Sequence, residues 1–176
     1  QANVYSHATR FACCRYGNVF GSSGSVIPLW EEQLRALGRI QITDPQMTRF
    51  FMTIDEACKL VENALIDMNG GEIFVPRIRS LRMGDLAGAW YPGVEIETVG
   101  IRPGEKPHEV LISEHESYRT FDQNKRFVIA PVAREWMTEN IQGDAMAAGS
   151  QYSSDQNLLD SKGIREWLRS LQSWGL

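Results

Sequence analysis

The order of apolar and polar positions predicts strands and helices that alternate along the chain. A short, nearly unbroken apolar run over residues 11–16 is typical of a strand buried on both faces. A loop bearing glycine and serine follows it. Ser25 is suited to cap a helix, apolar residues recur at helical spacing behind it, and Gly38 is placed to end that helix. The start of the chain is therefore predicted to be a strand, a loop and an amphipathic helix.

The middle of the chain continues this alternation. Thr53 and Glu56 have the spacing of a capping box, and the apolar residues behind them keep helical spacing, which predicts a second helix. Residues 72–76 predict another short buried strand, and the apolar spacing that follows Ser80, a candidate cap, predicts a third helix. Residues 94–99 alternate as in a strand. Strands alternating with helices indicate an α/β architecture.

Beyond residue 113 the pattern loosens. Strands are predicted near Tyr118 and over residues 126–130, while the polar residues 139–157 predict a loop or a partly ordered segment. Residues 158–176 are predicted to hold a terminal helix that docks on an apolar surface. Its apolar stripe consists of Ile164, Trp167, Leu168, Leu171 and Trp174.

The composition fits a globular domain with an ordinary core, because 43% of the 176 residues are hydrophobic and five are tryptophan. The net charge of -4, with acidic and basic residues interspersed, argues against a nucleic-acid-binding surface. Any phosphate is therefore expected to be bound locally by a few arginines. The sequence contains no run of about 18 apolar residues, so it predicts no membrane-spanning helix. The N-terminus lacks the layout of a secretory signal. A cytoplasmic protein is expected.

The cysteines and histidines predict no metal site. Cys13, Cys14 and Cys58 lack metal-ligand spacing, and the adjacent Cys13 and Cys14 are not expected to pair because they point to opposite faces of a strand. All three are expected to be buried thiols in a reducing cytosol. His108 and Glu109 lack the second histidine of a zinc-binding helix, and all three histidines are expected to serve packing or the surface. A Gly-x-Ser-x-Gly elbow for an acyl-transfer serine is also missing.

The strand at residues 94–99 is followed by Arg102-Pro-Gly-Glu105, the most informative stretch of the sequence. A rigid Pro-Gly corner holds one guanidinium and one carboxylate a fixed distance apart, which suits a diphosphate next to a ribose diol. Arg49 lies between apolar neighbours, where a guanidinium is held firmly enough to clamp a phosphate; a structural salt bridge is the competing interpretation. Together these residues predict a nucleotide-linked ligand.

Three glycines, Gly17, Gly21 and Gly24, lie between the first strand and the first helix and fit a dinucleotide-binding loop. Asp44 lies about 20 residues further on, where a ribose-binding acid is sought. Against this hypothesis, the strand that ends at Asp44 is short and Pro45 follows at once. A tight turn is the other interpretation.

Taken together, the motifs resemble the carboxy-terminal half of the inverting UDP-N-acetylglucosamine 4,6-dehydratases, sugar-nucleotide enzymes of the extended short-chain dehydrogenase/reductase superfamily. The resemblance covers about residues 9 to 113, and Tyr152-Ser-Ser with the terminal helix resembles the closing segment of the family. The motifs are Arg15-Tyr-Gly-Asn-Val19, Gly24-Ser-Val-Ile-Pro28, Ile42-Thr-Asp-Pro45, Met47-Thr-Arg-Phe50, Asp55-Glu56-Ala57, Gly71-Glu-Ile-Phe-Val-Pro76 and Gly100-Ile-Arg-Pro-Gly-Glu-Lys106 with His108-Glu109.

The resemblance implies the carboxy-terminal part of an NAD(P)-binding Rossmann fold, that is its last parallel strands, plus a small mixed α/β substrate-binding lobe. Within residues 1–138, segments of the Rossmann sheet would be interleaved with segments of the substrate-binding lobe. It also implies the substrate-binding portion of an enzyme that uses NADP, or NAD, to remove water from a UDP-sugar in surface-polysaccharide biosynthesis. Transient oxidation at C4 accompanies inversion at C5 in that reaction. A homo-oligomer is expected.

The resemblance also implies roles for single residues. Asn18 would hydrogen-bond the diphosphate or the sugar. The backbone around Ile27 and Pro28 would line the sugar-nucleotide cleft, and Thr43 would lie near the uracil.

Other roles concern charge and the cofactor. Arg49 and Arg102 would clamp the diphosphate, Glu105 would accept from the ribose hydroxyls, and Tyr16 would pack near the nicotinamide. The sequence departs from the family at Ser23, where an arginine is usual, and at Pro107, where a leucine is usual.

The 176 residues contain no Tyr-x-x-x-Lys pair. In the family this pair, the acid/base residues and the cofactor glycine motif would precede the position of Gln1, so no catalytic residue is expected in this chain. The chain alone is expected neither to turn over substrate nor to bind cofactor tightly. The first strand, at residues 11–15, would lack its neighbouring strands of the Rossmann sheet. The chain is therefore expected to self-associate through that edge or to expose apolar surface.

Two alternatives remain open. A regulatory module without chemistry of its own would use Arg49, Arg102 and Glu105 to bind a UDP-sugar. A sibling epimerase or reductase of the same superfamily would share the substrate-binding motifs.

Overall fold

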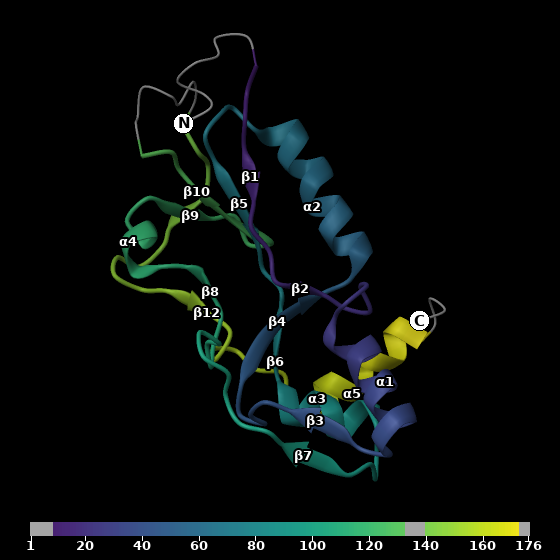
Figure 1. Ribbon diagram of the computed structural model, residues 1–176. Coiled ribbons are helices and arrows are strands. Elements are labelled where there is room, and N and C mark those ends of the chain that lie inside the picture. Colours follow the sequence, from purple (N-terminus) through teal and green to yellow (C-terminus); the bar gives the residue numbers. More distant parts are fainter. Residues whose placement is uncertain (1–8, 133–139, 173–176) are drawn as a thin grey trace. The chain divides into compact units, whose positions relative to one another are not determined.

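The computed structural model describes residues 9–132 and 140–172 as helices and short strands of a mixed α/β protein (Figure 1). Contacts divide the chain into two units that each draw on separate segments. Unit 1 comprises Gln1–Tyr16, Asp55–Arg77 and Val110–Ser153, and unit 2 comprises Gly17–Ile54, Ile78–Glu109 and Ser154–Leu176. In the described part of the chain, no helix has the length and apolar character needed to cross a membrane.

Unit 1 is built on a sheet in which β1 and β5 run parallel and the other neighbours run antiparallel. Its strands, in order across the sheet, are β1 (Cys13–Cys14), β5 (Ile73–Pro76), β10 (Arg126–Ile129), β9 (Thr120–Asp122) and β11 (Asp144–Ala145). Helix α2 (Ile54–Asp67) buries Leu60 and Ala64 in one core with Phe74 and Val128. A smaller sheet pairs β8 (Val110–Ile112) with β12 (Tyr152–Ser153). The short helix α4 (Glu114–Ser117) follows β8 in the chain.

Unit 2 is organised around β4 (Thr48–Met52), which pairs in parallel with β2 (Asn18–Val19) and antiparallel with β6 (Arg79–Arg82). A second, parallel pair joins β3 (Ile40–Ile42) to β7 (Ile96–Thr98). Helices α1 (Val26–Leu37), α3 (Met83–Trp90) and α5 (Ser161–Gln172) contribute to one apolar core with β4, β3 and β6. Two-stranded parallel pairing and a helix-rich core give this unit its mixed α/β character.

The helix ends follow local sequence signals in most cases. Helix α1 begins directly after Ser25, although the Ser25 side chain makes no capping hydrogen bond. It ends at Gly38, whose φ of 69° is the left-handed conformation that glycine adopts without strain. Helix α2 begins directly after Thr53. Ser80 is the exception, because it lies in β6 opposite Phe50 and α3 begins only after Arg82. The prediction of Ser80 as a helix cap was therefore wrong, since pairing with β4 extends the strand past it.

The cysteines were also predicted wrongly, because Cys13 and Cys58 are exposed and Cys14 is half-buried. Strand β1 is the last strand at its edge of the described sheet, so one side of Cys13 stays uncovered. Cys58 lies on α2 away from the buried positions Ala57, Leu60 and Ala64. Partial burial raises the pKa of the Cys14 thiol.

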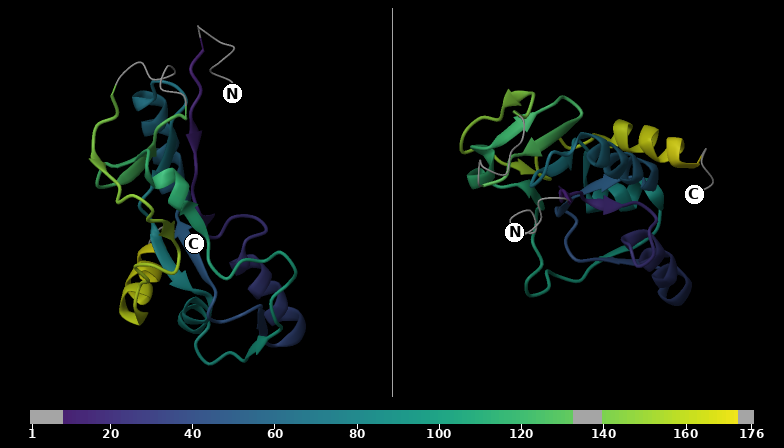
Figure 2. Two further views of the ribbon diagram at one scale, coloured as in Figure 1. Left: turned by 90° about the vertical axis from the view of Figure 1, so that its left-hand side faces the viewer. Right: turned by 90° about the horizontal axis from the view of Figure 1, so that it is seen from above.

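The carboxy-terminal part is more ordered than a plain loop. Residues 140–157, within the segment expected to be a loop or partly ordered, carry β11 and β12 joined by turns. Helix α5 packs beside α3 in unit 2 (Figures 1 and 2). It buries Ile164, Trp167, Leu168 and Leu171 as the apolar stripe predicted, whereas Trp174 lies outside the described residues.

A bidentate ion pair ties β1 to α4 within unit 1. Both terminal nitrogens of Arg15 donate to the carboxylate of Glu116 at 2.9 Å, and Arg15 also donates to the carbonyl of Leu111 at 2.8 Å. Glu116 additionally accepts from Ser113 in the capping box of α4. The hydrogen bonds from Arg15 lower the pKa of Glu116 from 4.5 to about 2.

This ion pair predicts an acid-sensitive contribution to stability. Because the folded-state pKa of Glu116 lies below its ordinary value, the contribution is fully present above pH 4.5 and is lost as the pH falls towards about 2. Glu116→Gln should lower the free energy of unfolding near neutral pH by about 1–2 kcal/mol, allowing for solvent screening. Urea titrations across this pH range should show a flatter acid limb for Glu116→Gln. The exposed neighbour Glu114→Gln is the control, and an equally steep limb in both variants would contradict the assignment.

Helix α2 carries a second apolar stripe that the described residues leave exposed. Val61, Leu65 and Ile66 are 50%, 68% and 79% exposed, in contrast to the buried Leu60. We expect this surface, together with the open edge of β1, to bind a hydrophobic dye or to promote self-association. Leu65→Lys should reduce dye fluorescence without loss of stability, whereas Leu60→Lys should unfold unit 1. A monomeric wild-type chain that leaves the dye dark would refute the expectation.

Candidate functional site

Unit 2 contains a pocket of about 300 Å³. The start of α1, the strands β3 and β4 and the segment 99–105 that follows β7 supply its wall. Polar and charged residues of that wall are Asn18, Ser25, Gln33, Gln41, Thr43, Asp44, Arg49, Arg102 and Glu105. Its size lies at the lower end of the range for small-molecule sites.

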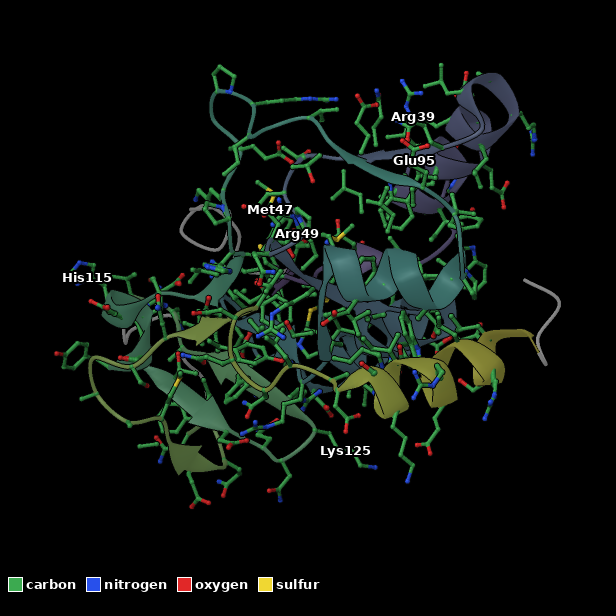
Figure 3. All side chains as sticks on the ribbon, turned by 90° about the horizontal axis from the view of Figure 1, so that it is seen from below. Arg39, Met47, Arg49, Glu95, His115 and Lys125 are labelled. Carbon is green, nitrogen blue, oxygen red and sulfur yellow. The ribbon has the colours of Figure 1, made fainter. Side chains whose placement is uncertain are left out.

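The alternation of β4 decides which residues face the pocket. Met47, Arg49 and Phe51 line it, as expected for positions two apart on one face of an extended chain. Figure 3 shows Met47 and Arg49 next to one another, and the guanidinium approaches the Met47 sulfur at 3.4 Å. The intervening Thr48 and Phe50 are buried and do not line the pocket.

Arg49 is held by several partners, and its side chain is only 16% exposed. One terminal nitrogen donates to the carbonyls of Thr48 and Pro107, at 2.8 and 3.1 Å. The other lies 3.6 Å from the Glu105 carboxylate, and Nε lies 3.8 Å from Glu109. The salt-bridge interpretation of Arg49 therefore describes part of its environment, and the same side chain also forms pocket wall.

The Pro-Gly corner is closed by its own backbone. The Glu105 N–H donates to the carbonyl of Arg102 at 3.0 Å, and Gly104 takes a φ of 84° that favours glycine. The Gly100 N–H donates to the carbonyl of Thr43 at 3.0 Å, which fixes the approach of this corner to the end of β3. Arg102, Glu105 and Thr43 thereby meet at one wall although β3 and the corner are far apart in the chain.

The first turn of α1 adds donors to the pocket. Ser25 and Val26 line it, and the first N–H groups of a helix have no partner inside the helix. The hydroxyl of Ser25 is buried without a hydrogen-bond partner among the described residues. A helix N-terminus also carries a partial positive charge that favours anions.

Asn18 is oriented by contacts outside the pocket. Its side-chain nitrogen donates to the carbonyl of Phe50 at 3.1 Å and to the two carboxylate oxygens of Glu109 at 3.1 and 3.2 Å. Glu109 also accepts from the Phe50 N–H at 2.9 Å. Glu109 thus connects β2 to β4 through one carboxylate.

A buried network holds the backbone of Glu109. Its N–H donates to the hydroxyl of Ser154 at 2.8 Å, and the Ser154 N–H donates to the Glu109 carbonyl at 2.8 Å. The hydroxyls of Thr48 and Ser154 lie 2.7 Å apart, and Thr48 also contacts Nδ1 of His108 at 2.8 Å. Ser80 donates to the carbonyl of Ser154. Three separate segments of unit 2 are joined in this way.

Most of the predicted site residues meet at the pocket. Asn18, Thr43, Arg49, Arg102 and Glu105 all line it. The other predicted residues, Ile27, Pro28 and Tyr16, do not line it.

The residues on either side of Ile27 and Pro28 line the pocket in their place. The Ile27 side chain is buried in the core of unit 2, while Val26 and Leu29 form pocket wall. Tyr16 belongs to unit 1 and is 43% exposed.

The sequence predictions missed Gln33 and Gln41, which are hydrogen-bonded to each other and line the pocket. The Gln41 N–H donates to the Gln33 side chain at 2.8 Å, and the Gln41 amide donates to Glu97 at 2.9 Å. No local motif marks them, because their pairing depends on the approach of α1 to β3. Glu109 was also missed, although it adjoins the recognised corner.

The glycine loop serves packing and turns. A Cβ on Gly17 would lie 2.4 Å from the Cβ of Phe50, so glycine allows β2 to approach β4 closely. Gly21 and Gly24 have φ values of 71° and 75°, as turns require. These contacts favour the turn interpretation. Within residues 9–132 and 140–172, no group of His, Cys, Asp and Glu side chains could hold a metal ion.

Comparison with known proteins finds similar sequences among polysaccharide biosynthesis proteins and sugar-nucleotide enzymes. Residues 1–131 match the family described as polysaccharide biosynthesis protein. A UDP-N-acetylglucosamine 4,6-dehydratase (inverting) of Campylobacter jejuni is 38% identical over 160 residues, which cover 86% of this chain and 48% of that relative. A UDP-glucose 4-epimerase of Rickettsia rickettsii is 38% identical over 121 residues, 66% of this chain and 36% of the epimerase.

A solved structure shares the fold. The X-ray structure of Pen from Bacillus thuringiensis superposes with a TM-score of 0.83 at 33% identity, covering 93% of this chain and 51% of that protein. The chain thus spans about half the length of the dehydratase and of Pen.

Proposed function

The chain belongs to the polysaccharide biosynthesis protein family, and from this premise we propose that the unit 2 pocket binds a UDP-sugar as part of a UDP-N-acetylglucosamine 4,6-dehydratase. The resemblance to these dehydratases that the motifs predicted is confirmed. The mixed α/β fold class with parallel strands is confirmed as well. Similarity to both dehydratases and epimerases supports a nucleotide-sugar-modifying enzyme of polysaccharide biosynthesis.

One observation supports the ligand class above all others. Arg49, Arg102 and Glu105 line a single pocket together with the first turn of α1. Two guanidinium groups and helix N–H groups suit a diphosphate, while a carboxylate suits a vicinal diol that donates two hydrogen bonds. A nucleoside diphosphate carries both groups a short distance apart.

The ion pair between Arg49 and Glu105 is compatible with ligand exchange. Its closest N···O distance of 3.6 Å is longer than a hydrogen bond. A diphosphate oxygen would therefore replace a loose contact of Arg49, and Glu105 would turn to the ribose hydroxyls. We assign Thr43, which also lines the pocket, to the uracil.

The proposed reaction requires a nicotinamide cofactor, NADP or NAD, which supplies reversible hydride acceptance at C4 of the sugar. Tyr16 offers a 43% exposed ring after β1, which fits packing against a flat heteroaromatic ring. The loop of Gly17 does not fit a pyrophosphate cradle, since Phe50 fills the space beside it. This chain therefore contributes substrate contacts, and the main cofactor contacts lie elsewhere.

The chain alone is not expected to complete the dehydration. Its sequence contains no Tyr-x-x-x-Lys pair to exchange protons with the sugar hydroxyl. Formation of a 4-keto sugar by the purified chain with NADP would contradict this part of the proposal. We also propose that the protein is a homo-oligomer located in the cytoplasm.

A sibling epimerase is the second candidate. The similarity to the UDP-glucose 4-epimerase of Rickettsia rickettsii supports it. Both candidates require the same UDP-sugar pocket.

Calorimetric titration tests the pocket. UDP should bind the wild-type chain, and Arg102→Ala should weaken binding about tenfold or more, because a charge-assisted hydrogen bond to phosphate is lost. Arg49→Ala should do the same. Arg35→Ala removes an arginine of α1 whose side chain is 78% exposed, and it should bind UDP as the wild type does. Heats of UDP binding that neither pocket variant changes would refute the clamp.

A further inference from the structure

Asn18 has already used both of its amide hydrogens. The side-chain nitrogen has two N–H donors, and its partners are the Phe50 carbonyl at 3.1 Å and the Glu109 carboxylate at 3.1 and 3.2 Å. A backbone carbonyl and a carboxylate both accept hydrogen bonds from this nitrogen. The opposite amide orientation would place the Asn18 oxygen against these acceptors, so the contacts settle which end is nitrogen.

The side-chain oxygen of Asn18 is therefore the group left for the pocket. Asn18 lines the pocket, and among the described residues its oxygen receives no hydrogen bond. An amide oxygen accepts hydrogen bonds and repels other acceptors. A diphosphate oxygen, also an acceptor at neutral pH, is a poor partner for it.

Glu109 is fixed firmly enough to impose this orientation. Its backbone exchanges two hydrogen bonds with Ser154, which is fully buried. Its carboxylate accepts from the Phe50 N–H at 2.9 Å and lies 3.8 Å from Nε of Arg49, whose charge compensates it. Glu109 itself is not among the residues that line the pocket.

We propose that Glu109 is a positioning residue that turns the Asn18 oxygen toward the pocket, so that Asn18 accepts a hydrogen bond from the sugar of a UDP-sugar. The inference rests on the proposed function, because it names the part of that ligand that Asn18 contacts. Glu105 accounts for the ribose hydroxyls and Thr43 for the uracil. The hydroxyl or amide N–H donors of the pyranose remain for Asn18.

Paired titrations with UDP and UDP-N-acetylglucosamine test this assignment. Asn18→Ala should weaken UDP-N-acetylglucosamine about fivefold to tenfold, the effect of one lost hydrogen bond, and should leave UDP unchanged. Glu109→Gln should weaken UDP-N-acetylglucosamine by more than UDP, because its new N–H₂ group opposes the Asn18 nitrogen, while any change in UDP affinity reports the loss of its charge beside Arg49. Glu62→Gln removes an exposed carboxylate of α2 and should affect neither ligand. Equal losses for both ligands in Asn18→Ala would overturn the inference, since they would place Asn18 at the diphosphate.

Nuclear magnetic resonance provides a readout that does not depend on ligand or on the folding of the Glu109 variant. The two side-chain amide protons of Asn18, identified by their absence in Asn18→Ala, should be shifted downfield and exchange slowly with water in the wild-type chain. They should keep this protection when UDP-N-acetylglucosamine is added. Rapid exchange of both protons would overturn the inference. If the wild-type chain binds neither ligand, the proposed function fails and the sugar assignment fails with it, whereas protected amide protons would still establish the orientation.

Discussion

The position of β4 between β2 and β6 is the constraint on which the candidate site depends. An extended chain sends alternate side chains to opposite sides, so Arg49 reaches the pocket only because Thr48 and Phe50 are buried away from it. Gly17 permits the close approach of β2. The single carboxylate of Glu109 then joins both strands. Pocket-lining side chains and buried packing side chains therefore alternate along this one strand.

The site also shows how opposite charges can share a small pocket. Arg49 and Arg102 lie on its wall with Asp44 and Glu105, so the pocket is not strongly positive. A general phosphate site would be dominated by basic groups. The mixture of guanidinium groups, carboxylates and helix N–H groups instead suits a ligand with an anionic part and neighbouring hydroxyl donors. A nucleotide-linked sugar has this combination.

Local signals in the sequence predicted part of the fold. Helix α1 could be predicted because Ser25 and Gly38 mark its ends through backbone conformation alone. Ser80 could not, since its place in β6 depends on pairing with β4. The exposure of Cys13 likewise depends on the order of strands in the sheet. Motifs predicted Asn18, Arg49 and the Arg102 corner as site residues, and these residues line one pocket. They could not predict the hydrogen bonds of Asn18 to Glu109, which lies 91 positions away in the chain.

The central claim is that one pocket of unit 2 binds a UDP-sugar. Backbone amide shifts in a titration of the ¹⁵N-labelled chain with UDP-N-acetylglucosamine test it most directly, because they locate the ligand without any substitution. We predict saturable shifts at the amides of Ser25, Arg49, Arg102 and Glu105, with unchanged amides on α2 and β10 of unit 1. Saturable shifts confined to unit 1, or no shifts at millimolar ligand, would contradict the claim.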